Sequence, residues 1–144
     1  MTDGILLVVR RTIRASAERL FTAWTDPRHL TAWWGPRPVT CAGAEVDLRI
    51  GGRYRIMNAM PDGSTLAIEG EFLEIERPAK LVYTWHAGQS AESSVVTVRF
   101  EERGETTEVI VVHDRIPSEA VKASHEGGWT GCLDGLERFI ASAR

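Results

Sequence analysis

Residues 117–141 read PSEAVKASHEGGWTGCLDGLERFIA and predict one long helix, which decides how the rest of the chain folds. Pro117 and Ser118 are typical of a helix start, and we expect the helix to run from Glu119 to Ala141. At 1.5 Å per residue it is roughly 34 Å long, enough to cross a whole β-sheet. One stripe of it, spaced by three or four residues, is predicted to face the sheet: Val121, His125, Trp129, Cys132, Leu136 and Ile140.

The opposite stripe of this helix is polar. Asp134 and Arg138 lie one turn apart on it, which predicts a favourable ion pair between them.

Before this helix, the spacing of apolar residues first indicates a strand and two short helices and then changes to the two-residue period of strands. Ile5–Ile13 reads as a strand, Ser16 is expected to cap a helix that ends before Pro27, and Arg28–Trp33 reads as a second short helix. The period is then two, with short turns, which predicts an antiparallel meander. The predicted strands are Val39–Asp47, Arg53–Met60, Thr65–Glu76, Lys80–His86, Ser94–Glu102 and Thr106–Arg115. The fold class is therefore α+β, one antiparallel sheet with helices on one face.

This architecture implies a pocket between the sheet and the final helix. A curved sheet and a long helix cannot touch along their whole length, and the two short helices can close only one end. We expect the pocket to bind a ligand through residues of the helix, the strands and the second short helix. The candidate ligand-binding residues are Trp33, Tyr54, Ile56, Trp85, Val111, His113, His125, Trp129 and Cys132.

Three glycines fall within five residues of the helix, at Gly127, Gly128 and Gly131. Each costs about 1 kcal/mol in a helix interior relative to alanine. Such a conflict between local propensity and fold indicates either a functional space or close packing against another element, and the sequence leaves both readings open.

Five tryptophans are many for 144 residues, and most are expected in the core. Trp33 and Trp34 are adjacent, so they cannot face the same way on a short helix. We expect one to face the sheet and the other to lie near the pocket rim or the surface.

Two histidines are predicted to point inward, His113 from the last strand and His125 from the helix. They form a candidate acid/base pair because imidazole titrates near neutral pH. The alternative is that they are neutral, hydrogen-bonded histidines of the core. Glu69 and Glu71 share one strand face, and a carboxylate would be of functional interest only if that face were inward.

No other site motif is present. The histidines lack metal-ligand spacing, and there is no Gly-x-Ser-x-Gly elbow or phosphate-binding glycine loop, so we expect no metal and no cofactor. Cys132 reads as a small buried hydrophobe.

Composition sets the broad class. The chain has 144 residues, a net charge of −3 and two cysteines, and it reads as one domain over residues 1–144. The charge argues against nucleic-acid binding, and no apolar run is long enough to span a membrane. We expect a reduced, cytoplasmic setting.

Several stretches together resemble a known family. Arg11–Trp34, Gly51–Arg55, Pro61–Gly63, Gly70–Trp85 and His125–Trp129 are similar to the SRPBCC, or START-like, superfamily, in the branch named after the activator of the heat-shock protein 90 ATPase. The resemblance covers about residues 8–142. It implies a helix-grip fold, a curved antiparallel sheet around a long C-terminal helix with a hydrophobic cavity between them.

The resemblance leaves the function open, because the superfamily includes lipid carriers, hormone receptors, cyclases and co-chaperone domains. We expect a binding module for a small apolar or amphipathic ligand. The alternatives are a cyclase- or hydrolase-like enzyme that uses a pocket histidine or carboxylate, and a co-chaperone-like interaction domain. A homodimer is the candidate assembly.

Overall fold

The computed structural model describes residues 4–88 and 93–142, and it confirms the predicted α+β helix-grip fold. Its elements follow the predicted order, with boundaries within one or two residues of those expected. They are β1 Ile5–Ile13, α1 Ala17–Thr25, α2 Pro27–Trp33, β2 Thr40–Val46, β3 Arg53–Ala59, β4 Thr65–Glu76, β5 Lys80–Ala87, β6 Ser94–Arg103, β7 Thr106–Ile116 and α3 Glu119–Ser142.

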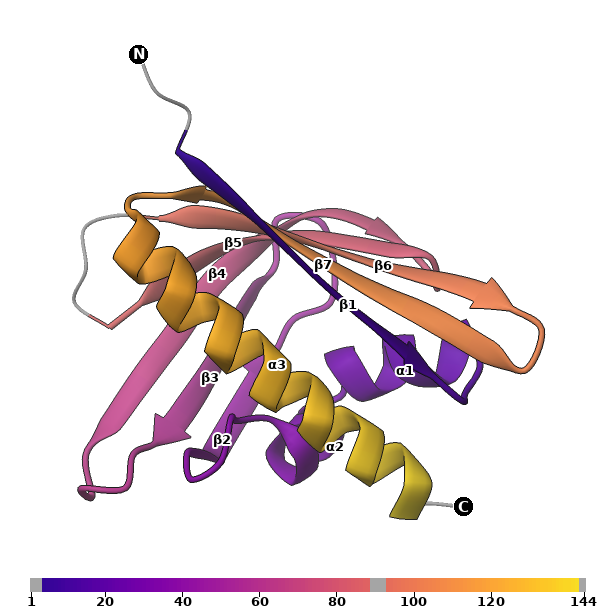
Figure 1. Cartoon of the computed structure of the whole chain (residues 1–144), viewed down its shortest axis with the longest axis horizontal. Coiled ribbons are helices and arrows are strands. Elements are labelled where there is room, and N and C mark those ends of the chain that lie inside the picture. The colour runs from indigo at the N-terminus through magenta and orange to yellow at the C-terminus, as the bar shows by residue number, and fades with distance from the viewer. Residues whose placement is uncertain (1–3, 89–92, 143–144) are drawn as a thin grey trace.

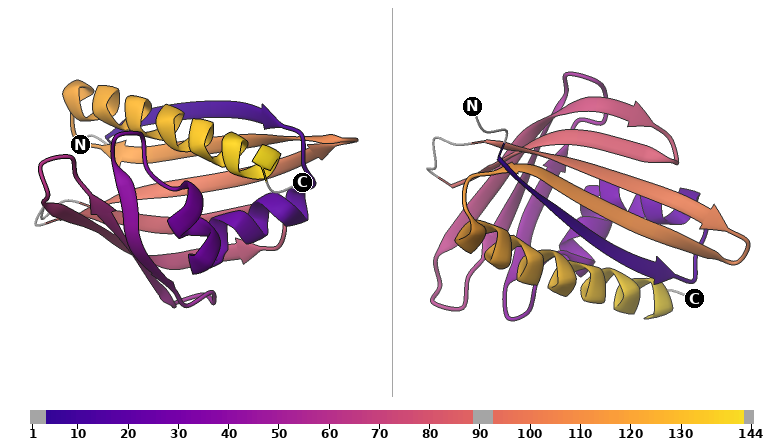
Figure 2. Two further views of the ribbon diagram at one scale, coloured as in Figure 1. Left: turned by 90° about the horizontal axis from the view of Figure 1, so that it is seen from below. Right: turned by 45° about the horizontal axis from the view of Figure 1, so that its top comes forward.

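The seven strands form one antiparallel sheet in the order β1-β7-β6-β5-β4-β3-β2. The first strand pairs with the last, so the chain closes one edge of the meander with its own N-terminal strand. Register shifts between Cys41 and Gly43 and between Phe72 and Glu74 interrupt the ladders, and such irregularities bend a sheet. Helix α3 crosses the concave face, with β1 on one side of it and α2 on the other (Figures 1 and 2).

The two short helices begin at the residues that the sequence predicts. The Ser16 hydroxyl accepts a hydrogen bond from the Arg19 amide at 3.1 Å. The Asp26 carboxylate caps α2 by accepting from the Arg28 amide at 2.9 Å, with Pro27 at the first helical position. Asp26 is at the same time the C-cap of α1, so a single residue joins the two short helices.

The predicted apolar stripe of α3 faces the sheet, and its last four members are buried together with Leu133. The predicted ion pair within the helix is wrong. Asp134 instead lies 2.8 Å from the guanidinium of Arg11 on β1. A charge on the neighbouring strand offers Asp134 a partner that sequence spacing cannot reveal, and this contact ties α3 to the edge of the sheet.

The helix glycines serve two purposes. A Cβ atom at Gly131 would lie 2.4 Å from Cβ and 2.7 Å from Cα of Pro36, so this glycine lets the loop after α2 approach the helix. A Cβ atom at Gly127 or Gly128 would meet nothing within 4 Å. Close packing therefore explains Gly131, whereas Gly127 and Gly128 border open space.

Within the residues that the structure describes, no helix has the length and apolar character needed to cross a bilayer.

This contrast between the glycines predicts opposite effects of the same substitution. Gly127→Ala should stabilise the protein by about 0.5–1 kcal/mol because alanine favours the helix and meets no neighbour. Gly131→Ala should destabilise it by about 1–3 kcal/mol because the new methyl group overlaps Pro36. Denaturant unfolding measures both. An equal stabilisation of the two variants would contradict the observed packing of the Pro36 loop.

Candidate functional site

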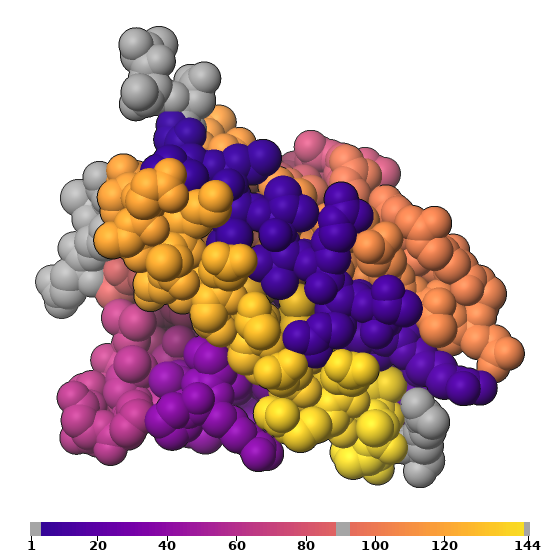
Figure 3. Space-filling model, viewed as in Figure 1, coloured from indigo at the N-terminus to yellow at the C-terminus, as the bar shows by residue number. Residues whose placement is uncertain are grey.

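A cleft of about 280 Å³ lies between α3 and strands β3, β4 and β5. We call it the α3 cleft. Its lining residues are mostly apolar, and none of those described carries a carboxylate, an ammonium or a guanidinium group. They are Trp34, Pro36, Val39, Asn58, Met60, Leu66, Ile68, Trp85, Ala87, Ser124, His125, Gly128, Trp129 and Cys132. In Figure 3 the surface is recessed between the N-terminal half of α3 and the neighbouring strands.

Four of the predicted binding residues meet in this cleft. Trp85 comes from β5, and His125, Trp129 and Cys132 come from successive turns of α3. Gly128 lies among them and leaves space beside the indole rings because it has no side chain.

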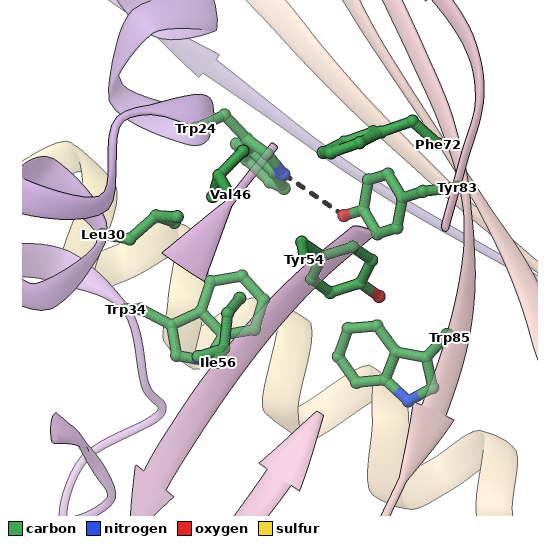
Figure 4. A pocket seen from close by; sticks show the side chains of 9 residues that line it. All are labelled: Trp24, Leu30, Trp34, Val46, Tyr54, Ile56, Phe72, Tyr83 and Trp85. Atoms are coloured by element: carbon green, nitrogen blue, oxygen red, sulfur yellow. Dashed lines mark hydrogen bonds between the residues drawn. The ribbon is translucent and has the colours of Figure 1, made fainter. Parts of the chain in front are cut away.

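Tyr54 and Ile56 lie elsewhere, around a small void of about 20 Å³ (Figure 4). That volume is close to what a single water molecule needs. Aromatic side chains fill the space on this side: Trp24 donates its indole N–H to the Tyr83 hydroxyl at 3.2 Å, and Tyr54 donates its hydroxyl to the Thr84 carbonyl at 2.7 Å. The interior near α1 is therefore packed.

Both of the adjacent tryptophans are buried, and one of them borders the cleft. Trp33 donates its indole N–H to the Ala23 carbonyl at 2.9 Å and lines a separate groove beyond α2. Trp34 follows the end of α2 in extended conformation, which turns its indole into the α3 cleft, where it donates to Asn58 Oδ1 at 3.0 Å. The residue of this pair that borders the cleft is thus Trp34.

His113 and Val111 are fully buried inside the sheet and line none of the cavities described. The ring of His113 has a hydrogen bond at each nitrogen: the Trp129 indole lies 3.1 Å from Nδ1, and Ser94 Oγ lies 2.6 Å from Nε2. An indole N–H can only donate, so Nδ1 accepts and the proton of the neutral ring resides on Nε2. His113 therefore donates to Ser94.

Burial keeps both inward histidines uncharged. Burial, with a smaller contribution from His125, lowers the pKa of His113 from 6.5 to about 3. The two rings are stacked with their centroids 4.4 Å apart, and burial lowers the pKa of His125 as well. No hydrogen bond from the His125 ring is observed among the described residues, so its nitrogens are available at the cleft mouth.

This geometry does not suit His113 as a general base. A base must accept a proton from the group it activates, whereas Nε2 of His113 already carries one and points it at Ser94. Burial also raises the pKa of the Cys132 thiol to about 12, so that thiol is protonated at neutral pH and is a poor nucleophile.

Glu69 and Glu71 alternate with inward-facing Ile68, Gly70 and Phe72 and lie on the outer face of β4. In the described part of the chain no group of three or more histidine, cysteine or acidic residues converges on a point.

Sequence analysis missed three polar features of the site. Asn58 shares the inward face of β3 with Tyr54 and Ile56, so strand alternation could have found it. Ser94 begins β6, and only the register places it beside the ring of His113. Trp85 has a buried indole N–H without an acceptor among the described residues, a feature that depends on the packing of all its neighbours.

The tautomer and the low pKa of His113 predict how stability depends on pH. In the unfolded chain His113 binds a proton near pH 6.5, whereas in the folded protein it stays neutral down to about pH 3. Its contribution to stability is therefore complete above pH 6.5 and is lost as the pH falls. Between pH 6.5 and 5 the loss should be about 2 kcal/mol.

His113→Gln tests this expectation, because an amide can accept from Trp129 and donate to Ser94 but does not titrate. The free energy of unfolding, measured against pH, should fall less steeply in the variant than in the natural protein. Identical slopes would show that His113 is protonated in the folded state and that the assigned hydrogen bonds are wrong.

Comparisons with known proteins agree with this fold. A family model described as Activator of Hsp90 ATPase homolog 1-like protein matches residues 14–141. Among solved structures, a protein of Silicibacter pomeroyi that bears the family's name superposes with a TM-score of 0.87 at 22% identity, covering 97% of this chain and 100% of that one. A protein of Rhodobacter sphaeroides gives a TM-score of 0.86 at 23% identity, with 98% and 96% covered.

A third structure, of a protein from Chromobacterium violaceum, gives a TM-score of 0.85 at 24% identity and covers 94% of this chain and 96% of its own. No protein of curated function matches the sequence. The solved structures share the fold at these identities, whereas the family model spans most of the sequence. The chain belongs to the family of Activator of Hsp90 ATPase homolog 1-like proteins.

Proposed function

We propose that this protein binds a small, largely apolar molecule in the α3 cleft. The observation that carries the proposal is the cleft itself: about 280 Å³ of space with mostly apolar walls and a few polar side chains. Ligand sites in proteins have this character, and the volume lies near the lower end of their usual range.

Gly128 supports the proposal because it keeps the cleft open. A glycine in the middle of a helix costs about 1 kcal/mol, and close packing against another element can offset that cost. No neighbour approaches Gly128, so the space beside it is empty. A ligand that fills this space would contact the helix backbone directly.

The hydrogen bonds of the indole groups support it as well. Four of the five tryptophans donate to acceptors within the protein: Trp24, Trp33, Trp34 and Trp129. The indole N–H of Trp85, which borders the cleft, has no acceptor among the described residues. An unpaired buried donor costs roughly 1–3 kcal/mol, and a ligand oxygen would offset that cost.

The enzymatic alternative has less support. The Ser94–His113 pair has the wrong tautomer for base catalysis, and the described lining of the cleft contains no acidic side chain. His125 alone remains as a titratable group at the cleft mouth, and a single imidazole is more simply read as a group that orients the ligand.

Two leucine substitutions test the proposal on adjacent residues of the same helix. Gly128→Leu places a side chain in the cleft, whereas Gly127→Leu places the same side chain outside it. With N-phenyl-1-naphthylamine as a neutral fluorescent probe, the first variant should bind at least about tenfold more weakly than the natural protein, which corresponds to ~1.4 kcal/mol. The second should bind like the natural protein.

Circular dichroism of both variants checks that the helix is intact. Failure of the natural protein to bind the probe, or equal affinity of the two variants, would overturn the proposal that the α3 cleft is the binding site.

A further inference from the structure

A second, smaller space of about 220 Å³ adjoins the α3 cleft at the start of α3. The two spaces share Trp85, Ala87 and His125 as walls. The smaller space is also bordered by Ser94 and Arg115. We call the group formed by Trp85, Ser94, Arg115 and His125 the donor corner: Ser94, Arg115 and His125 border this space with polar hydrogens, and the buried indole N–H of Trp85 has no acceptor among the described residues.

Three neighbouring strands bring these residues together. Trp85 on β5 is paired directly with Ser94 on β6. The ladder between β6 and β7 ends at the pair of Val95 with Asp114, and Ser94 and Arg115 are the next residues of the two strands beyond that pair. Three residues of the donor corner therefore come from the sheet, and the fourth, His125, comes from α3.

Ser94 is buried and is held as a hydrogen-bond donor. Its oxygen accepts a hydrogen bond from the Nε2–H of His113, because the Trp129 indole donates to the other nitrogen of that ring. No acceptor for the hydroxyl hydrogen of Ser94 is observed among the described residues. The chain of hydrogen bonds from Trp129 through His113 thus leaves one O–H free at the wall of the corner.

Arg115 owes its position to a bulge in β7. Ile5 of β1 pairs with Ile116 and Leu7 pairs with His113, so two residues of β7 stand opposite one residue of β1. Arg115 has φ = 64° and is the only non-glycine residue in ranges 4–88 and 93–142 with a positive φ. Bulges and left-handed residues re-aim side chains and are common beside functional sites.

Among the described residues that border the space, Arg115 has the only charged side chain. No ion pair of Arg115 is observed within the described chain, and no acidic residue is found among the described residues that border the space. The indole N–H of Trp85 has no acceptor, and in Figure 4 its nitrogen lies on the side of the ring turned away from the other side chains that line the small void. The corner therefore offers donors and one positive charge, with no described side chain to satisfy them.

We infer that the donor corner binds the carboxylate of an amphipathic ligand whose apolar part lies in the α3 cleft. This inference rests on the proposed function and adds the chemical class of the ligand. Arg115 offers a charged fork for the two carboxylate oxygens, and Ser94, Trp85 and His125 supply neutral donors around them. A singly charged head matches the single guanidinium, whereas a phosphate dianion would leave an unbalanced charge in a largely apolar site.

Matched ligands test the inference by displacement of N-phenyl-1-naphthylamine. Decanoate and decan-1-ol have the same chain and differ in the head group. Decanoate should bind about tenfold more tightly than decan-1-ol, which corresponds to ~1.4 kcal/mol, and more tightly than decyl phosphate. Arg115→Gln should reduce the affinity for decanoate about tenfold and leave that for decan-1-ol unchanged.

Three variants control for folding and for general charge. Arg115→Lys keeps the charge and should retain most of the preference for decanoate. Arg99→Gln removes an exposed charge from β6 outside the corner and should change neither affinity. Ser94→Ala should weaken decanoate binding selectively, and its unfolding free energy is measured in parallel because the substitution also removes the partner of His113.

The outcomes separate this inference from the proposed function. If decan-1-ol binds in the cleft but decanoate binds no more tightly, or if Arg115→Gln and Arg99→Gln act alike, the carboxylate assignment is wrong while the cleft remains a binding site. Tighter binding of decyl phosphate than of decanoate would also overturn the assignment. If neither decan-1-ol nor decanoate displaces the probe, the proposed function fails and the inference fails with it.

Discussion

The hydrogen bond from the Trp129 indole to Nδ1 of His113 is the interaction on which the site depends. It joins the middle of α3 to the inner face of β7 and so fixes the position of the helix relative to the sheet. Because the indole can only donate, it also determines which nitrogen of His113 carries the proton, and through that proton it fixes Ser94 as a donor. The same contact therefore has two consequences. The position of α3 leaves the α3 cleft beside the helix, and the tautomer of His113 leaves the hydroxyl hydrogen of Ser94 available to a ligand in the donor corner.

The tryptophans divide the interior into a packed part and an open part. Toward α1 and α2, the rings of Trp24 and Trp33 pack against each other at an interplanar angle of 52°, both indoles donate hydrogen bonds within the protein, and a small void remains around Tyr54. Toward the N-terminal half of α3, the helix presents Gly128 instead of a side chain, and Trp34 and Trp85 become walls of a larger space. Aromatic side chains provide rigid, flat surfaces at low entropic cost, which favours a largely preformed site.

Strand alternation and helix spacing predicted the fold and part of the site because both depend on local periodicity. The stripe through His125, Trp129 and Cys132 is one such case. The prediction that Tyr54 and Ile56 face inward is also correct. Alternation gives the direction of a side chain, however, and not the free space in front of it, and here aromatic rings fill that space. The predicted end of the second short helix at Trp33 is correct, but helix periodicity does not give the extended backbone at Trp34 that turns its indole into the cleft. The bulge at Arg115 and the ion pair of Asp134 with Arg11 arise from pairing with β1, more than 100 residues away in the chain, and no local pattern encodes them.

The most direct test of a ligand site beside Trp85 is a ¹H–¹⁵N correlation spectrum of the five indole N–H groups during titration with decanoate. Assignment by Trp85→Phe identifies the signal of the indole that has no acceptor in the described protein. The account predicts that this signal shifts most as the site fills, whereas those of Trp24 and Trp33, bonded to Tyr83 and Ala23, shift least. Saturation with the largest shifts at Trp24 or Trp33 and an unchanged Trp85 signal would contradict a ligand site in the α3 cleft.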